Sequence, residues 1–227
     1  MIITLKNINH YFLTTGKNEL RKTHMLNEFK EYNLIEVNPV LDIGKNKSGS
    51  TGFSKILDLA LRKQDRTKPF TPFIIYEDDC SKYREFPDCF EIPDDCDFFY
   101  LGISKCSMNS FTDHKGLYFQ HYDSEIVRVF NMLSTHGMII SSALGAMAIQ
   151  KAVAESYHRN ISWDVCISQL QWHYNVYAFK RPFVFQDKIY GGCEDETRFF
   201  IEKNTDSPIP EKYINVTNYS NITCTST

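Results

Sequence analysis

The sequence predicts an α/β fold, a single domain in which helices flank a mainly parallel central sheet. Apolar, β-branched runs alternate with amphipathic stretches in the order strand, helix, strand, helix, strand through the first 80 residues. This alternation is typical of β-α-β units, whose helical crossovers join parallel strands. The third apolar run then ends in three consecutive carboxylates, Glu77, Asp78 and Asp79. Because ligands of such sheets bind at the carboxyl ends of strands, we expect these side chains to face a cleft.

The amino-terminal part of the chain supplies the first five predicted elements. The strands are residues 1–8, 34–40 and 73–77, and the helices are residues 19–32 and 53–64. The second helix carries an apolar stripe that includes Ile56, Leu57 and Leu61, and basic residues close its last turn, as the helix dipole favours. The polar, glycine-bearing segment 42–52 in front of it is predicted to be a loop.

The remaining elements complete the sheet and add two helices. Strands are predicted at residues 97–102, 174–179 and 182–186, β-hairpins between residues 116 and 133, and helices at residues 141–158 and 162–173. Ser141 or Ser142 is placed to begin the first of these helices, and Ser162 to cap the second, with Asp164 in its first turn. Beyond about residue 203 the chain turns polar, so residues 1–205 are predicted to form the domain and residues 206–227 a tail or a linker within a longer polypeptide.

Composition excludes several classes of protein. Of the 227 residues, 42% are hydrophobic and 23% are charged, which is enough for an ordinary packed core. The formal net charge of −3 argues against a dedicated nucleic-acid binder, and no apolar run approaches the roughly 20 residues of a membrane span. The seven cysteines are scattered without zinc spacing, so free thiols and a cytoplasmic location are predicted.

The three carboxylates need a partner, because neighbouring like charges repel and each is costly to remove from water. Oxygen-only ligands suit a hard divalent cation such as Mn²⁺ or Mg²⁺, which leaves positions free for water and for substrate phosphates. The plainer alternative is a solvated turn after an edge strand. Their place after an apolar run, at the third strand end of an α/β pattern, favours the cation.

Several segments resemble known motifs when taken in order. "FIIYEDDC" followed by "DDCDFFYLGIS" resembles the acidic LEDD segment and the following D-x-x-x-LG strand of GT-A-fold glycosyltransferases, in particular those of family 25. "STGFSKILDLAL" is similar to that family's G-C-x-x-S-H helix, with Lys55 where histidine is usual. "STHGMIISSALGAMAI" is similar to its T-x-x-Y-x-I-S-x-x-G-A segment, with Met138 where an aromatic residue is expected. The likeness spans residues 49–154.

This resemblance implies a GT-A fold, which is a Rossmann-like domain that binds a nucleotide sugar, and a metal-dependent glycosyltransferase. The donor would be a UDP-sugar of the glucose, galactose or rhamnose type, and inversion at the anomeric carbon is favoured. The whole chain also resembles the amino-terminal domain of glycosyltransferases of large DNA viruses that infect algae. The acceptor would then be the glycan of a viral capsid glycoprotein, and the location the host-cell cytoplasm.

The resemblance also assigns roles to residues at the donor site. Asp79 would ligate Mn²⁺ or Mg²⁺ on the donor diphosphate, and Asp78 or Glu77 would hold the ribose, the sugar or metal-bound water. Lys6 and Asn7, in a turn after the first strand, would seat the nucleobase and ribose. Lys55 would contact the diphosphate as a point charge. For these three, the alternatives are a surface turn and a solvated helix residue.

An inverting transfer also needs a general base for the acceptor hydroxyl. Asp164 is the candidate, because backbone N–H groups hold a carboxylate in a helix's first turn and Trp163 beside it offers an apolar face to a sugar. The alternative is a charge that only stabilises the helix. His136 is a second candidate for base or donor contact, although a lone histidine is often structural. Gly191 and Gly192, after Tyr190, are candidates for a loop that closes over the donor.

Two other classes of function compete with this hypothesis. A nucleotidyltransferase or phosphatase also uses carboxylates and Mg²⁺, but the sequence has no P-loop, no G-x-G-x-x-G and no second carboxylate cluster. A lectin-like or scaffold domain would use the acidic turn only to bind Ca²⁺. The aromatic content of 14% suits sugar binding in either case.

Overall fold

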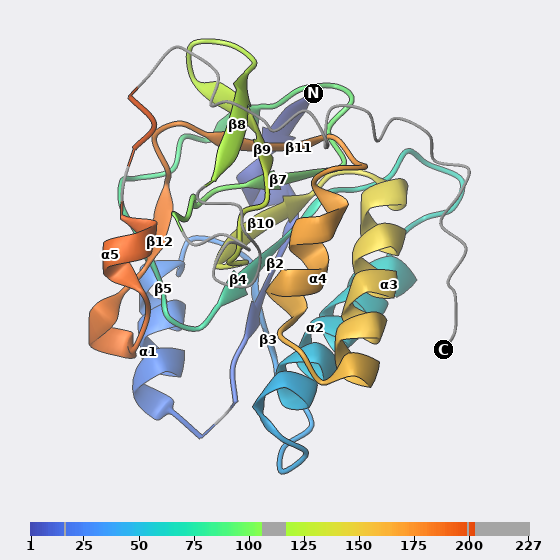
Figure 1. The fold of residues 1–227 in the computed structure, drawn as a ribbon, viewed down its shortest axis with the longest axis vertical. Coiled ribbons are helices and arrows are strands. Elements are labelled where there is room, and N and C mark those ends of the chain that lie inside the picture. The colour runs from blue at the N-terminus through green and yellow to red at the C-terminus, as the bar shows by residue number, and fades with distance from the viewer. Residues whose placement is uncertain (16, 106–116, 199, 203–227) are drawn as a thin grey trace.

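An eight-stranded sheet runs through the molecule, and helices cover both of its faces (Figure 1). The computed structural model describes residues 1–15, 17–105, 117–198 and 200–202. The strand order is β3-β2-β4-β10-β7-β11-β9-β8. These strands are β2 (Asn9–Leu13), β3 (Leu34–Val37), β4 (Phe73–Glu77), β7 (Phe98–Tyr100), β8 (Tyr118–His121), β9 (Ile126–Phe130), β10 (Gly137–Ile140) and β11 (Val176–Phe179).

The sheet is mixed, so the prediction of a mainly parallel sheet is wrong. Three pairings are parallel, β2 with β3, β2 with β4 and β7 with β11. The other four are antiparallel, because β10 and β9 run against their neighbours. The predicted β-α-β-α-β order is right for β2, β3 and β4. The sequence does not show that β10, a strand from much later in the chain, inserts in reverse beside β4.

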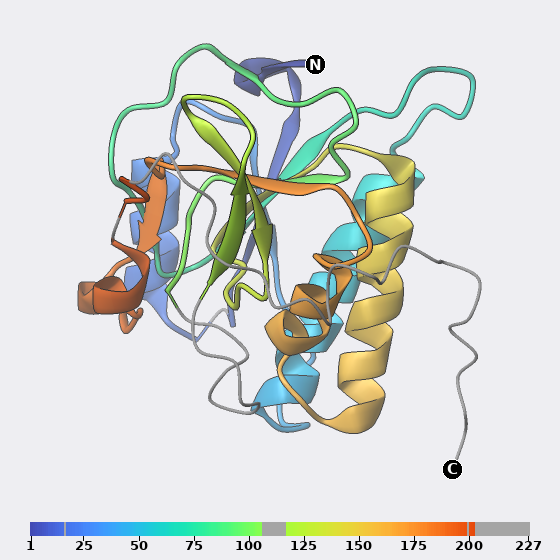
Figure 2. The same ribbon diagram turned by 45° about the horizontal axis from the view of Figure 1, so that its top comes forward.

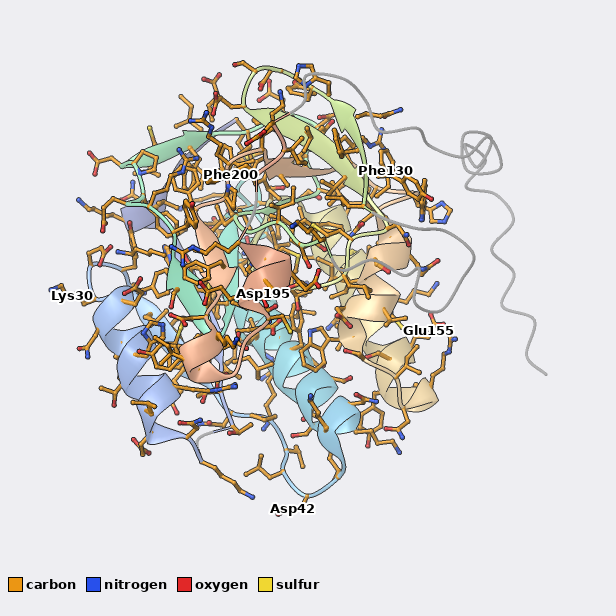
Figure 3. All side chains as sticks on the ribbon, turned by 60° about the vertical axis from the view of Figure 1, so that its left-hand side comes forward. Lys30, Asp42, Phe130, Glu155, Asp195 and Phe200 are labelled. Atoms are coloured by element: carbon orange, nitrogen blue, oxygen red, sulfur yellow. The ribbon has the colours of Figure 1, made fainter. Side chains whose placement is uncertain are left out.

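Three helices pack on one face of the sheet and α1 on the other (Figures 1 and 2). They are α1 (Glu19–Glu28), α2 (Lys45–Arg62), α3 (Ala143–Arg159) and α4 (Trp163–Leu170), followed by the short α5 (Glu194–Thr197). Two small sheets pair β1 (Ile2–Thr4) with β6 (Cys89–Glu91) and β5 (Cys80–Lys82) with β12 (Val184–Gln186). In Figure 3, Lys30 beyond α1 and Glu155 on α3 lie towards opposite sides of the view, with Asp195 on α5 between them.

Alternation along the strands builds two apolar cores. On β4, Phe73 and Ile75 join the core beneath α2, α3 and α4, whereas Ile74 and Tyr76 join the core beneath α1. Successive strand residues point to opposite faces, so a strand buried on both sides is apolar throughout. Glu77, the last residue of β4, is therefore the first charged residue of the strand, and it lies where the strand leaves the sheet.

Helix α2 begins at Lys45, eight residues before the predicted start at Phe53. The glycines and serines that indicate a loop are instead required by close packing. A Cβ on Gly49 would lie 1.8 Å from the Trp163 ring, and one on Gly52 would lie 2.1 Å from Leu13. The first turns of α2 thus lie directly against α4 and β2, and this contact outweighs the poor helix propensity of glycine.

The first strand of the central sheet is also displaced from its predicted position. Within residues 1–8, Ile2–Thr4 form β1, which pairs with β6 outside the central sheet, and Leu5–Asn7 form a 3₁₀ turn; the central strand β2 follows them. The predicted helices 19–32, 141–158 and 162–173 correspond to α1, α3 and α4, and the predicted hairpin to β8 and β9. Ser142 caps α3 by accepting a hydrogen bond from the Gly145 N–H, whereas Ser162 caps α4 without a side-chain bond.

Some predictions concern residues that the structure does not describe, and others can be checked only for the residues that it does describe. The predicted tail, residues 206–227, lies outside them, and so does Cys106. The five cysteines that are described are free thiols, as predicted. Within the same ranges, no helix has the length and apolar character needed to cross a bilayer.

His10 on β2 is a buried histidine whose two ring nitrogens are both engaged. Nε2 lies 2.9 Å from the Leu5 carbonyl oxygen, Nδ1 lies 3.2 Å from the Tyr76 hydroxyl, and the ring stacks on Tyr32. Burial lowers the pKa of His10 to about 4, so the ring stays neutral in the folded protein. In the unfolded chain a histidine binds its proton near pH 6.5.

The free energy of unfolding is therefore expected to fall as the pH drops from 6.5 towards 4, because the unfolded state binds more protons over this range. From this residue alone the loss between pH 7 and pH 5 is about 1–2 kcal/mol. Urea unfolding at both pH values checks it. His10→Gln keeps a donor and an acceptor but should flatten the dependence, whereas His158→Gln, at an exposed position, should not. Equal slopes for all three proteins would contradict the assignment.

A candidate active-site cleft at the ends of the strands

A cleft of about 600 Å³ opens where β2 and β4 end. Its walls come from the end of β2, the acidic turn after β4, the first turns of α2 and α4, the segment before β10 and the segment after β12. Register explains why these segments meet. Gly137, at the start of the reversed β10, pairs with Tyr76 near the end of β4, so the residues before β10 reach the same edge of the sheet.

The acidic turn presents two buried carboxylate oxygens that have no hydrogen-bond partner. Asp78 and Asp79 are 6% and 7% exposed, and both line the cleft. Asp78 Oδ1 accepts a hydrogen bond from Arg21 at 2.7 Å, but Asp78 Oδ2 and Asp79 Oδ1 are buried without a partner. A buried charged oxygen left unpaired is costly, so a cation or a hydrogen-bond donor at these two atoms would be stabilising.

The charges around the cleft fit a divalent cation. Four carboxylates line it, those of Glu77, Asp78, Asp79 and Asp164, against the basic side chains of Arg21 and Lys45. No group of three or more potential metal ligands is assembled in the described part of the chain. Mg²⁺ and Mn²⁺ need only one or two protein carboxylates when substrate phosphates and water complete their shell. Asp78 and Asp79 fit such an ion.

Burial has a strong effect on the acid–base behaviour of the turn. It raises the pKa of Asp79 to about 6, against the opposing influence of Arg21. Burial also raises the pKa of Glu77 to about 8, and the negative charge of Asp79 adds to this. The surroundings of both carboxyl groups therefore disfavour their charged form.

Glu77 is the centre of a hydrogen-bond network that spans the cleft. Its Oε1 accepts from the Thr135 hydroxyl at 2.6 Å, and its Oε2 accepts from the Gln186 amide at 3.2 Å. Thr135 in turn accepts a hydrogen bond from Trp163 Nε1 at 2.8 Å. Gln186 Oε1 accepts from the Ser134 hydroxyl at 3.3 Å. Ser134, with φ of 97°, is held in a strained backbone conformation beside the cleft.

Asp164 faces this cleft from the first turn of α4, as predicted. Its Oδ1 accepts a hydrogen bond from the Val165 N–H at 2.8 Å. The preceding residue, Trp163, lays its ring on the backbone of α2 at Gly49. The Asp164 carboxylate is thus held by a backbone N–H of its own helix, and the helix is held by the Trp163 ring, which packs between α4 and α2.

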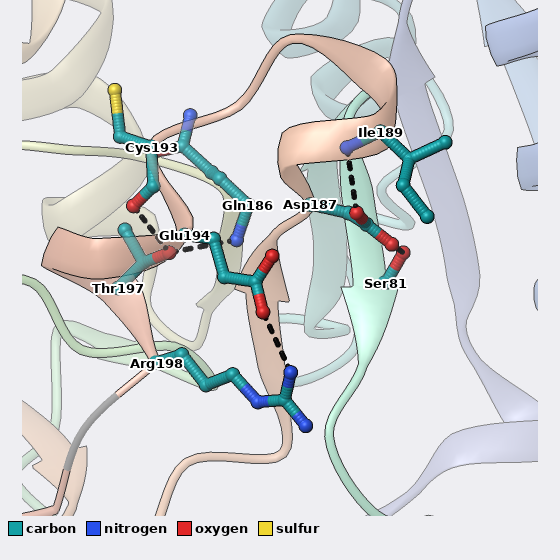
Figure 4. A network of polar contacts seen from close by, with 8 residues as sticks. All are labelled: Ser81, Gln186, Asp187, Ile189, Cys193, Glu194, Thr197 and Arg198. Atoms are coloured by element: carbon teal, nitrogen blue, oxygen red, sulfur yellow. Dashed lines mark hydrogen bonds and ion pairs between the residues drawn. The ribbon is translucent and has the colours of Figure 1, made fainter.

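The segment after β12 is anchored before it reaches the rim of the cleft (Figure 4). Asp187 accepts hydrogen bonds from the Ser81 hydroxyl and the Ile189 N–H, and its own N–H donates to the Asp79 carbonyl at 2.8 Å. Tyr190 stacks on His24 of α1. Gly191, with φ of 83°, and Gly192 then line the cleft, so the predicted glycine segment lies at its rim.

Four predicted site residues are not brought to this cleft. Lys6 and Asn7 precede β2 and so lie at the opposite end of that strand, where Lys6 pairs with Asp88. Lys55 does not line the cleft and donates a hydrogen bond to the Asn38 carbonyl oxygen. His136 is fully buried, with Nδ1 bonded to the Ser134 hydroxyl, and burial lowers its pKa to about 3.

Sequence reasoning missed Arg21, Thr135 and Gln186. Arg21 lies on the helix that follows β2, and the alternation of strands and helices alone does not select it from the other basic residues of α1. Thr135 and Gln186 depend on the reversed β10 and on the pairing of β12 with β5, in which Gln186 faces Cys80. The available signals were that Gln186 ends a predicted strand and that Thr135 comes shortly before the apolar run 138–140.

Fold and site together define a mixed α/β domain with an acidic cleft at the carboxyl ends of its parallel strands. Neither a protein-family model nor a curated protein sequence matches the chain. Among solved structures it is similar to A197 from STIV, with 10% identity and a TM-score of 0.45 over 89% of this chain and 98% of that one. It is also similar to LicC, the CTP:phosphocholine cytidylyltransferase from Streptococcus pneumoniae, with 10% identity and a TM-score of 0.43 over 80% of this chain and 74% of that one. The resemblance to family 25 stays a prediction from the motifs.

Proposed function

We propose that this chain is a metal-dependent glycosyltransferase that moves a hexose or deoxyhexose from a UDP-sugar to a glycan hydroxyl. The observation that supports it most is the pair of unpartnered, buried carboxylate oxygens of Asp78 and Asp79. They face the same cleft as Asp164, the candidate base. A cation site and a fixed carboxylate in one cleft are the two parts that such a transfer needs.

Asp78 and Asp79 would hold Mn²⁺ or Mg²⁺, which neutralises charge on the departing diphosphate. Arg21 keeps Asp78 oriented and adds a positive charge to this end of the cleft. Thr14 and Thr15, at the end of β2, occupy the strand-end position at which such sheets bind a nucleoside, in place of Lys6 and Asn7.

Asp164 would take the proton of the acceptor hydroxyl on one of its carboxylate oxygens. The hydrogen bond that Asp164 Oδ1 accepts from the Val165 N–H holds the side chain in place. The remaining wall of the cleft includes the apolar side chains of Trp163, Leu133 and Pro39, which exclude water and suit the apolar face of a sugar.

Thermal unfolding in the presence of Mn²⁺, UDP or both tests this function. Ligands present at about 100 times Kd stabilise a fold by about 2.7 kcal/mol. For a domain of this size that corresponds to a rise in Tm of about 5–10 °C. Mn²⁺ and UDP together should exceed the sum of their separate effects, because each supplies part of the other's site.

A donor screen completes this test. Release of UDP from UDP-glucose, UDP-galactose and UDP-rhamnose, with and without Mn²⁺, should identify the sugar. A shift with Ca²⁺ and free sugars but none with Mn²⁺ and UDP would indicate a binding module instead. Turnover of a nucleoside triphosphate without turnover of any UDP-sugar would indicate a nucleotidyltransferase.

A further inference from the structure

The network around Glu77 connects the two halves of the proposed reaction centre through one hydroxyl group. Thr135 is fully buried. Its Oγ1 accepts from Trp163 Nε1 at 2.8 Å and donates to Glu77 Oε1 at 2.6 Å. Glu77 is the residue before the acidic turn, and Trp163 is the residue before Asp164.

The directions of these hydrogen bonds fix the arrangement. An indole N–H only donates, so the Thr135 oxygen accepts from Trp163, and the hydrogen of the Thr135 hydroxyl is left to bond Glu77 Oε1. The second Glu77 oxygen is occupied by Gln186. The Trp163 ring is immobilised on its other side, since it rests on the α2 backbone at Gly49 and packs beside Phe53. Rotation of this ring would therefore require the loss of both contacts.

We propose that Thr135 is a positioning residue, whose hydroxyl holds the first turn of α4, and with it the Asp164 carboxylate, at a fixed place relative to the metal-binding turn. This inference rests on the proposed function. It goes further, in that the distance between the donor end and the acceptor end of the cleft is set by a side chain that does not itself line the cleft. Displacement of a reacting group by about 1 Å costs about 10²-fold in rate, which is why a fixed spacer has value.

Thr135→Val in the full chain is the main test, because valine keeps the shape and removes the hydroxyl. The rate of UDP release from the fastest UDP-sugar of the donor screen should fall about 10–100-fold in kcat, with KM for the donor within about threefold. Thr135→Ser should restore kcat. Trp163→Phe, which keeps a ring on Gly49, should give the same loss, and the double variant should be no worse than either single one.

Ser141→Ala is the matched control. Ser141 is also buried and donates to a single buried acceptor, the Cys96 carbonyl oxygen, but it does not line the cleft. Its replacement should lower stability and leave kcat unchanged. A purely structural role for Thr135 predicts the same behaviour as this control, so unchanged kcat in Thr135→Val would overturn the proposal.

The hydrogen bond itself can be observed without turnover. The chain has two tryptophans, so Trp172→Phe leaves one indole N–H signal in a ¹⁵N spectrum. That signal should move upfield in Thr135→Val and stay in place in Thr135→Ser. An unmoved signal overturns the proposal by itself. If wild-type protein binds neither Mn²⁺ nor UDP, the proposed function fails instead, and a positioning role in it fails with it.

Discussion

Asp79→Asn is expected to remove the Mn²⁺-dependent turnover of UDP-sugars while leaving the free protein at least as stable as wild type. Asp79 is 7% exposed, and its Oδ1 has no partner. Asparagine has nearly the same size, but it is a poor ligand for a hard cation and carries no charge. Loss of one stabilising group for developing charge lowers kcat by about 10²–10³-fold, and loss of the ion itself should reach the upper end of this range.

The effect of the same substitution on stability has the opposite sign. Removing the Asp79 charge ends the cost of burying that charge and its repulsion with Asp78 and Glu77, and together these outweigh the lost attraction to Arg21. Tm without ligands should therefore stay equal or rise, and the joint shift with Mn²⁺ and UDP should vanish. Asp88→Asn, at an exposed position beside Lys6, is the matched control and should change neither quantity. Normal Mn²⁺-dependent turnover of Asp79→Asn would refute the metal assignment.

Asp164→Asn is expected to separate binding from chemistry. Removal of a general base costs about 10²–10⁴-fold in rate. The carbonyl oxygen of asparagine can still accept from the Val165 N–H, so α4 should lose only the helix-dipole contribution of about 0.3–1 kcal/mol. The Tm shift with Mn²⁺ and UDP should persist, because Asp164 belongs to a different segment from the acidic turn.

A carboxylate that only stabilises its helix would behave differently. Glu194→Gln offers that comparison, because Glu194 also lies in a helix's first turn but does not line the cleft. It should change stability slightly and leave UDP release unaffected. If Asp164→Asn matches this control in rate, Asp164 is a helix-stabilising residue and the base lies elsewhere.

The sequence predicts the donor side of this cleft better than the rest, and the reason is local. Strand β4 is buried on both faces, so its apolar run is unmistakable, and Glu77 marks its end without any knowledge of tertiary contacts. Asp164 is likewise found from a local signal, the start of an amphipathic helix. Both residues line the cleft that the structure shows.

Predictions that depend on long-range pairing were less successful. The parallel sheet was inferred from neighbours in the chain, but β4 pairs with β10, which lies about 60 residues later. The assignment of Lys6 and Asn7 rests on the first apolar run being a strand of the central sheet, whereas that run forms β1 in a separate two-stranded sheet with β6. The start of α2 was missed because glycine serves there for contact with Trp163 and Leu13 rather than for a turn.

The reversed direction of β10 bears on how this cleft could diversify. Its approach segment, residues 131–136, contains two non-glycine residues with positive φ, Asn131 at 65° and Ser134 at 97°. Thr135 lies in this segment and bonds both Glu77 and Trp163, so an insertion or deletion here would move the two ends of the cleft relative to each other. Related chains that keep the length of this segment are therefore expected to keep the spacing of the cleft, whatever acceptor they use.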